Sequence, residues 1–186
     1  ATLMGVFSQW RQGAVQVLLV PNRGRDIAPK IVALAGVNRD YDLCLHLHGK
    51  KSVHWGHGDA WRRDLLDTLL GSEATVRSIL AAFAAAPDLG MVSPRVWHPL
   101  EGAINWGYEF DRVRALARRM GIAITPETCL EFPAGSMFWA RGAALGPLLD
   151  LGLTTQDFPV EDGLVHGSLA HAIERLFLHV LSLIHI

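Results

Sequence analysis

AVQVLLVPNRGRDIAPKIVALAGVNRDYDLCLHLH, residues 14–48, contains two apolar segments joined by a polar loop and a helix-like segment. Ala14–Val20 and Asp42–His48 are rich in branched aliphatic residues, which is typical of buried strands. Between them, Ile27–Val37 predicts a helix that carries Pro29 in its first turn. A strand, a helix and a second strand form the unit from which parallel sheets are built.

The remaining sequence continues this alternation. It predicts helices over 60–70, 72–85, 111–120, 144–149 and 167–178, and strands over 90–94 and 131–141. Ser168 is well suited to cap the last helix. We therefore expect one α/β domain over residues 1–180, with a Rossmann-like, mostly parallel sheet flanked by helices.

The two ends of the chain stand apart from this pattern. The chain begins with Ala1 rather than Met and stops inside an apolar run. We therefore expect the domain to be incomplete at its N-terminus. Residues 181–186 resemble a translated sequencing adaptor, so we expect a non-native tail there and leave it out of the functional argument.

The composition excludes several classes of protein. The chain has 186 residues, half of them hydrophobic, with 17 basic and 18 acidic residues and a net charge of −1. Such a balance gives no basic field for nucleic acid. Cys44 and Cys129 form no CxxC motif, so neither a disulfide framework nor a cysteine zinc site is indicated. No apolar run reaches the roughly 18 residues of a membrane span.

Ligands of open α/β sheets bind beyond the carboxyl ends of the strands, which here selects the loops at 22–26, 46–52 and 93–97. In the first loop, Gly24 permits close backbone approach and Asn22 adds a polar side chain. Arg23 and Arg25 suit phosphate, and Asp26 suits a ribose or base. An Arg–Asp pair that caps the following helix is an equal alternative.

The second loop brings imidazoles and ammonium groups together. His46 and His48 project from one face of a strand, and Gly49 turns Lys50 and Lys51 forward. Such a cluster suits a diphosphate leaving group. A metal site of the His-x-His type is the rival interpretation, which the adjacent lysines oppose. Core histidines beside a solvated lysine pair are the structural alternative.

Two later segments supply further candidates. The segment 132–141 offers Gly135, Ser136, Trp139 and Arg141 for a sugar or acceptor pocket, although some of its aromatics belong in the core. The predicted general bases, Glu161 and Asp162, lie on a loop before a helix. On that helix, His171 is assigned either to the same pocket or to ordinary packing.

Five blocks in this order resemble the rhamnan synthesis protein F family, over roughly Val17 to Phe177. The blocks are Asn22–Ile27, Tyr41–Ser52, Trp61–Arg62, Phe132–Trp139 and Leu169–Arg175. The resemblance implies a glycosyltransferase of bacterial cell-surface polysaccharide synthesis. The layout is also similar to the GT-A plan, with cationic side chains where that plan has a metal motif.

The resemblance implies a nucleotide-sugar donor such as dTDP-rhamnose and a glycan or lipid-linked glycan acceptor. It further implies an inverting, metal-independent reaction without a cofactor. The expected location is the cytoplasm, with peripheral association at the inner face of the plasma membrane. A metal-dependent hydrolase using His46 and His48, and a noncatalytic carbohydrate-binding module, are the alternatives.

Overall fold

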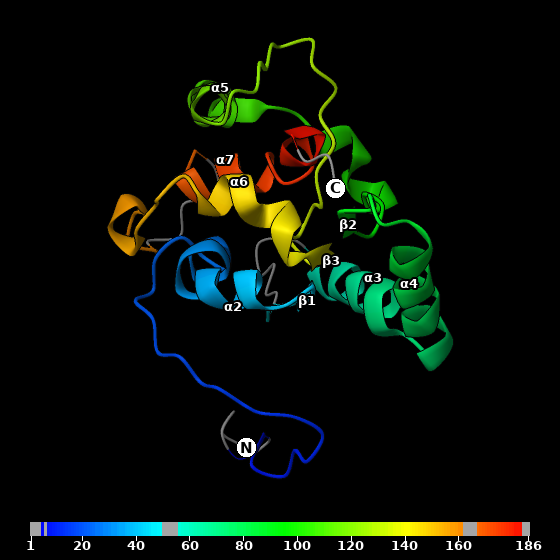
Figure 1. Cartoon of the computed structure of the whole chain (residues 1–186). Coiled ribbons are helices and arrows are strands. Elements are labelled where there is room, and N and C mark those ends of the chain that lie inside the picture. Colours follow the sequence, from blue (N-terminus) through cyan, green and yellow to red (C-terminus); the bar gives the residue numbers. More distant parts are fainter. Residues whose placement is uncertain (1–4, 6, 50–55, 162–166, 184–186) are drawn as a thin grey trace.

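The computed structural model describes residues 5, 7–49, 56–161 and 167–183. Its sheet has three strands, β1 (Leu43–His46), β2 (Met91–Val92) and β3 (Phe138–Arg141), in the order β1-β3-β2 (Figure 1). Both outer strands are antiparallel to β3, and Cys44 and Met91 pair with its Ala140 from opposite sides.

The expectation of a mostly parallel, GT-A-like sheet is therefore wrong for the described residues. β1 and β2 run in the same direction, as the sequence pattern suggests, but β3 lies between them. β3 can occupy the centre because Phe138 and Ala140 are completely buried on one of its faces. On the other face, the Trp139 indole donates to the carbonyl of Leu69.

Helices cover both faces of this sheet (Figure 1). One layer contains α3 (Gly58–Leu70) and α4 (Glu73–Ala85). The other elements are η1 (Pro29–Ala33), α2 (Ala35–Asp40), η2 (His98–Ala103), η3 (Gly107–Glu109), α5 (Phe110–Arg119), η4 (Gly142–Leu145), α6 (Gly146–Leu149), η5 (Thr155–Asp157), α7 (Leu169–Glu174) and η6 (His179–Leu183). The main core joins η1, α5, α6 and α7 to Phe138 of β3.

The helices follow local signals closely. Ser72 caps α4 by accepting a hydrogen bond from the Thr75 N–H at 3.0 Å, and Ser168 caps α7 as predicted. The expected helix over 27–37 is instead divided at Leu34, whose φ of −99° and ψ of 13° are not helical. A wide turn closed by Leu34 N–H and the Pro29 carbonyl precedes this break.

The predicted strand Ala14–Val20 is also wrong. This segment is irregular and exposed, and it leads away from the body of the molecule (Figure 1). Leu19 is 97% exposed. An apolar segment becomes a strand only where another strand satisfies its backbone groups, and none of the described residues pairs with this one.

The exposure of Leu19 predicts that shortening its side chain has little effect on the stability of the protein. We expect Leu19→Ala to change the free energy of unfolding by less than about 0.5 kcal/mol, because it uncovers no buried surface. The control Ile31→Val removes a single methylene from a residue that is 4% exposed and should cost about 0.5–1.5 kcal/mol. Urea unfolding of both variants measures the difference. A larger loss for Leu19→Ala would place segment 14–20 in the core.

Candidate functional site

Two loops far apart in sequence, 22–26 and 158–161, are held together as one unit. The contacts are Arg23 Nη1 to the Phe158 carbonyl at 2.7 Å, the Arg25 N–H to Glu161 Oε1 at 2.9 Å, and the Glu161 N–H to the Asn22 carbonyl at 3.2 Å. An isolated antiparallel bridge joins Arg23 to Val160. The predicted loop with the arginines thus lies beside the predicted loop with Glu161.

Two left-handed turns frame the site. Gly24 and Arg25 have φ values of 63° and 55°, and Gly135 and Ser136 have 93° and 55°. A side chain at Gly24 would lie within 2.4 Å of the Phe158 ring, so glycine is required there. Left-handed backbone at Arg25 and Ser136 costs about 1–2 kcal/mol per residue and persists only where the surroundings hold it.

Lys30 connects the two turns through its buried side chain. Its side chain is 4% exposed, and its ammonium donates to Asp26 Oδ2 at 3.0 Å and to the Ser136 carbonyl at 2.5 Å. The same nitrogen lies 5.1 Å from the ring centre of Phe138 and 5.7 Å from that of Phe177. A single buried cation therefore fixes one turn relative to the other.

Glu174, on α7, holds the second turn from its other side. Its Oε1 accepts hydrogen bonds from the Gly135 N–H and the Ser136 hydroxyl, both at 3.0 Å. Because Ser136 is 3% exposed, these bonds satisfy groups that water does not reach. The turn is consequently fixed by both Glu174 and Lys30.

The two predicted histidines have different environments. His48 Nε2 lies 2.7 Å from the Gly135 carbonyl and 3.8 Å from Asp26 Oδ2. Since a carbonyl only accepts, Nε2 carries the proton in this contact. His46 is 6% exposed, and its ring centre lies 4.9 Å from that of Phe138. His46 is a core side chain behind the site.

Burial and charge set the ionisation of this cluster. Burial alone would raise the pKa of Asp26, but the attraction of Lys30 and His48 outweighs it and the pKa is lowered. Burial lowers the pKa of Lys30, and Asp26 and Glu174 offset part of that effect. Asp26 is therefore an ionised acceptor with a side chain 19% exposed at the site.

The burial of His46 predicts that the folded protein loses stability at acid pH. Burial, reinforced by repulsion from Lys30, lowers its pKa from 6.5 to about 3. Below pH 6.5 the unfolded chain therefore binds a proton that the folded chain excludes, so stability falls as pH decreases from 6.5 toward 3. We expect a slope approaching about 1.4 kcal/mol per pH unit. Unfolding in urea at several pH values should show a shallower slope for His46→Leu, and equal slopes would contradict this assignment.

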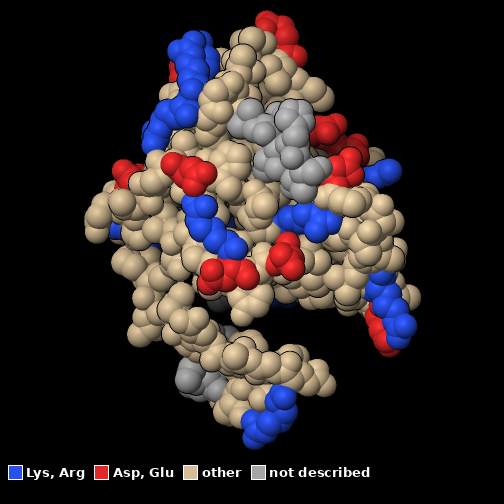
Figure 2. All heavy atoms as spheres, in the orientation of Figure 1, with Lys and Arg blue, Asp and Glu red and all other residues tan. Residues whose placement is uncertain are grey.

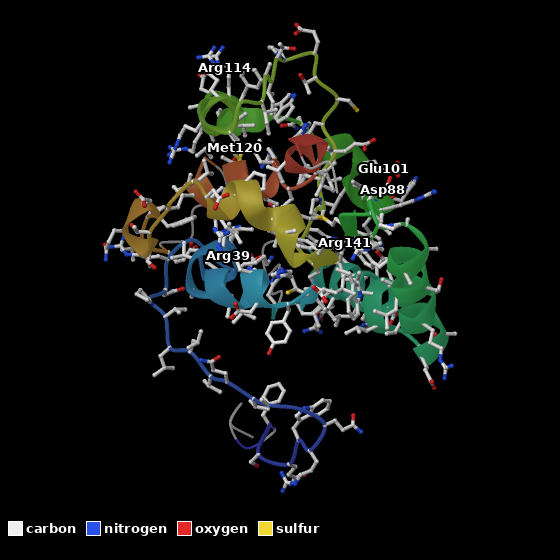
Figure 3. The ribbon with its side chains drawn as sticks, viewed as in Figure 1. Arg39, Asp88, Glu101, Arg114, Met120 and Arg141 are labelled. Carbon is white, nitrogen blue, oxygen red and sulfur yellow. The ribbon has the colours of Figure 1, made fainter. Side chains whose placement is uncertain are left out.

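Other predicted site residues lie apart from this cluster. Trp139 packs under α3, and Arg141 donates to the carbonyls of Phe83 and Leu89 beside α4 (Figure 3). His171 Nδ1 lies 2.7 Å from the Ser168 hydroxyl in the cap of α7. These three residues stabilise helix ends and packing. Lys50, Lys51 and Asp162 lie outside the described residues.

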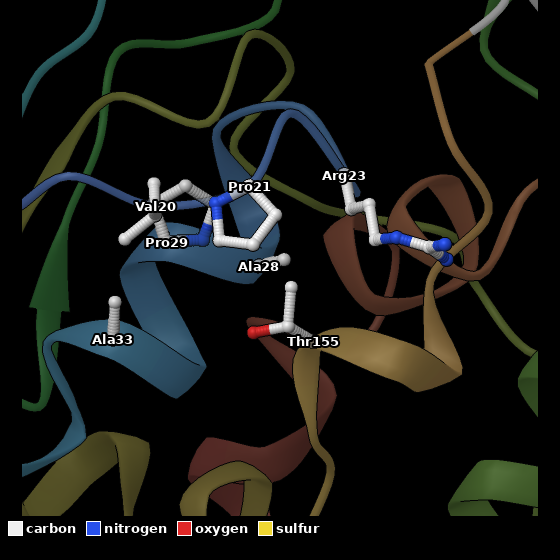
Figure 4. Close-up of a pocket in the computed structure, with 7 residues that line it drawn as sticks. All are labelled: Val20, Pro21, Arg23, Ala28, Pro29, Ala33 and Thr155. Carbon is white, nitrogen blue, oxygen red and sulfur yellow. The ribbon is translucent and has the colours of Figure 1, made fainter.

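A small pocket lies next to the loop that carries Arg23. This pocket of about 10 Å³ beside Val20, Pro21 and Pro29 has room for one water molecule, and Arg23 points away from it (Figure 4). Acidic and basic side chains alternate on the face in Figure 2. Within the described residues, no group of three or more His, Cys, Asp or Glu could hold a metal ion.

Lys30 is a site residue that the sequence argument misses. Lys30 interrupts the apolar residues of Ile27–Val37 and follows Asp26 by four positions. A lone lysine on an otherwise apolar helical segment is a usable signal of a buried ion pair. The contact of Glu174 with Gly135 joins segments 39 residues apart, and no local pattern marks it.

The comparisons with known proteins agree with this order of motifs. The family model described as "Rhamnan synthesis protein F" matches residues 5–183. The chain belongs to the rhamnan synthesis protein F family. This membership relates it to polysaccharide synthesis, as the resemblance predicts.

Relatives of this family member occur in two strains of Xanthomonas campestris pv. campestris. Both are named "Uncharacterized protein WxcX" and are 43% identical over 155 residues, which cover 83% of this chain. The chain spans about a fifth of their length, since the match covers 22% of each relative. No solved structure matches the chain. In its described part, no helix is both long and apolar enough to cross a bilayer.

Proposed function

We propose that the chain contributes the donor site of a glycosyltransferase in the synthesis of rhamnose-containing polysaccharide. The observation that carries this proposal is the convergence of two left-handed turns on one ionised carboxylate, Asp26. His48 Nε2 lies 3.8 Å from Asp26 Oδ2, and Arg25, the residue before Asp26, faces Glu161. Membership of the rhamnan synthesis protein F family supports the polysaccharide context.

The donor in this proposal is a nucleotide-activated sugar, with dTDP-rhamnose the first choice. Asp26 accepts hydrogen bonds from a hydroxyl or N–H of the nucleotide. Arg25 and His48, together with Lys50 and Lys51, stabilise the negative charge that develops on the departing diphosphate. Arg23 is left out of this role, because its guanidinium is turned to the Phe158 carbonyl. The reaction needs no metal ion, because these cations take the place of one.

The two proposed bases receive different roles. Glu161 is engaged by Arg25, with its Oε1 accepting from the Arg25 N–H at 2.9 Å and its Oε2 lying 3.7 Å from the Arg25 Nε. A carboxylate in that position orients the arginine. The next residue, Asp162, is therefore our choice for the base that takes the proton from the acceptor hydroxyl. The acceptor is a glycan or a lipid-linked glycan, which fits a cytoplasmic site at the membrane surface.

Specific contacts disfavour the alternatives. A His46/His48 metal site is opposed by the burial of His46 against Phe138. A carbohydrate-binding surface built on Trp139 is opposed by the packing of that indole under α3.

Calorimetric titration tests the proposal. The protein is titrated with dTDP-rhamnose, UDP-glucose and GDP-mannose, each with and without EDTA. We expect binding of one donor, unchanged by EDTA and weakened in Asp26→Asn. Binding that EDTA abolishes and a divalent ion restores would contradict the proposal that cationic side chains replace a metal ion. If the folded protein bound none of the donors, the proposal of a donor site would be contradicted.

A further inference from the structure

A groove of about 400 Å³ lies beside loop 22–26, and Arg23 of that loop lines it. It is bounded by loop 22–26, α5, the segment that follows η5 and the start of α7. The residues used in the argument below are Arg23, Arg112, Asp157, Phe158, Ser168 and Leu169. Phe158, which is completely buried, and Leu169, which is 6% exposed, belong to the hydrophobic core behind this groove.

Two arginines from separate elements line this groove. Arg23 donates through Nη1 to the Phe158 carbonyl at 2.7 Å, which fixes the direction of its guanidinium. Arg112 is exposed on α5, and within the described part of the chain its side chain makes neither a hydrogen bond nor an ion pair. Its neighbours differ, because Arg114 pairs with Asp111 at 2.8 Å and Arg119 donates to the Leu151 carbonyl at 2.6 Å.

The acidic side chain in the groove is already engaged. Asp157 accepts hydrogen bonds from the Thr154 N–H at 2.7 Å and from the Thr154 hydroxyl at 2.8 Å. These bonds lower the pKa of Asp157 and hold its carboxylate toward its own turn. The described lining therefore presents two guanidinium groups and one carboxylate that is turned to the backbone.

The groove also lies next to the proposed chemistry. The backbone of Arg23 forms the antiparallel bridge with Val160, and Glu161 follows Val160 in the same segment. A molecule in the groove would thus be close to segment 158–161, which directly precedes the proposed base in the sequence. Guanidinium groups bind planar oxyanions through paired hydrogen bonds. The volume of the groove leaves room for a sugar beside such an oxyanion.

Resting on the proposed transferase function, we infer that this groove is the acceptor subsite and that the acceptor carries an oxyanion. That oxyanion is a phosphate ester or a sugar carboxylate. Arg112 and Arg23 hold it, and the sugar ring lies in the groove between α5 and the start of α7. The arrangement makes Arg112 a specificity residue that selects a charged acceptor over a neutral one.

Titration followed by NMR, without any nucleotide, tests this inference. The probes are glucose 1-phosphate, glucuronate, glucose and inorganic phosphate. We expect one of the two charged sugars to shift the amide signals of Gly167, Ser168 and Leu169 and to bind more tightly than glucose or phosphate alone. Whether the phosphate ester or the carboxylate binds identifies the oxyanion.

Two arginine variants on the same helix provide the decisive comparison. Arg112→Ala should weaken the charged sugar by at least about tenfold, because it removes charge-assisted hydrogen bonds. Arg118→Ala, on the same helix but away from the groove, should change it by less than about twofold. The inference would be overturned if the two variants weakened binding equally. It would also be overturned if glucose or inorganic phosphate bound as tightly as the charged sugar. This titration contains no nucleotide-sugar donor. A negative result would therefore contradict the acceptor subsite without bearing on the donor site.

Discussion

Replacing Lys30 by methionine is expected to lower the free energy of unfolding by about 3–5 kcal/mol, because it removes one partner of a buried ion pair. Methionine fills the space between Phe138 and Phe177, so little packing is lost. Asp26 and the Ser136 carbonyl, which lie 3.0 Å and 2.5 Å from the ammonium, both lose their donor. Urea unfolding measures the change.

Two further variants separate this effect from a general loss of charge. Lys30→Met combined with Asp26→Asn should be less destabilised than Lys30→Met alone, because no buried carboxylate is left without its cation. Arg39→Met breaks the exposed pair with Asp150, whose side chains are 50% and 69% exposed, and should cost less than about 1 kcal/mol. A loss for Lys30→Met as small as that for Arg39→Met would show that Lys30 does not fix the two turns.

Asp162→Asn is expected to reduce the rate of sugar transfer by about 10²–10⁴-fold, the usual contribution of a general base. The amide has nearly the same shape but cannot accept the proton of the acceptor hydroxyl. Donor affinity should remain within about twofold of the wild-type value, because the change affects the transition state rather than donor binding. Transfer from dTDP-rhamnose to a glycan acceptor, measured together with donor titration, checks both expectations.

The matched variant is Glu161→Gln. Glutamine keeps the hydrogen bond from the Arg25 N–H and loses the charge that faces the Arg25 guanidinium. We therefore expect weaker donor binding and a much smaller effect on the rate at saturating donor. If Glu161→Gln slowed transfer as strongly as Asp162→Asn, the roles of the two carboxylates would be reversed.

The helices could be predicted because their signals are local. Ser72 and Ser168 mark the starts of α4 and α7 within a single turn, and Arg118 and Arg119 close α5. The pairing of the sheet could not be predicted in this way. Whether Phe138–Arg141 lies between the other strands depends on contacts with residues 43–46 and 91–92, which no short pattern encodes.

Segment 14–20 also shows that a local sequence pattern does not determine strand pairing. Its composition is that of a buried strand, yet strand formation needs a partner as well as a pattern. For the site, the strand-end argument predicted that the loops of Asp26 and His48 lie together, and His48 Nε2 lies 3.8 Å from Asp26 Oδ2. Gly135, whose carbonyl lies 2.7 Å from the same nitrogen, came from the separate candidate segment 132–141. That segment also offered Trp139 and Arg141, although their contacts with α3 and α4 depend on residues about 50–70 positions away.

Hydrogen exchange with and without the donor tests the central claim, that these converging turns form the donor site. Saturating dTDP-rhamnose is added to the wild-type protein, and exchange is followed by mass spectrometry of its peptides. We predict slower exchange in the peptides that contain residues 22–26 and 133–136, and a loss of this protection in Asp26→Asn. Donor binding that leaves exchange in both segments unchanged would contradict the account.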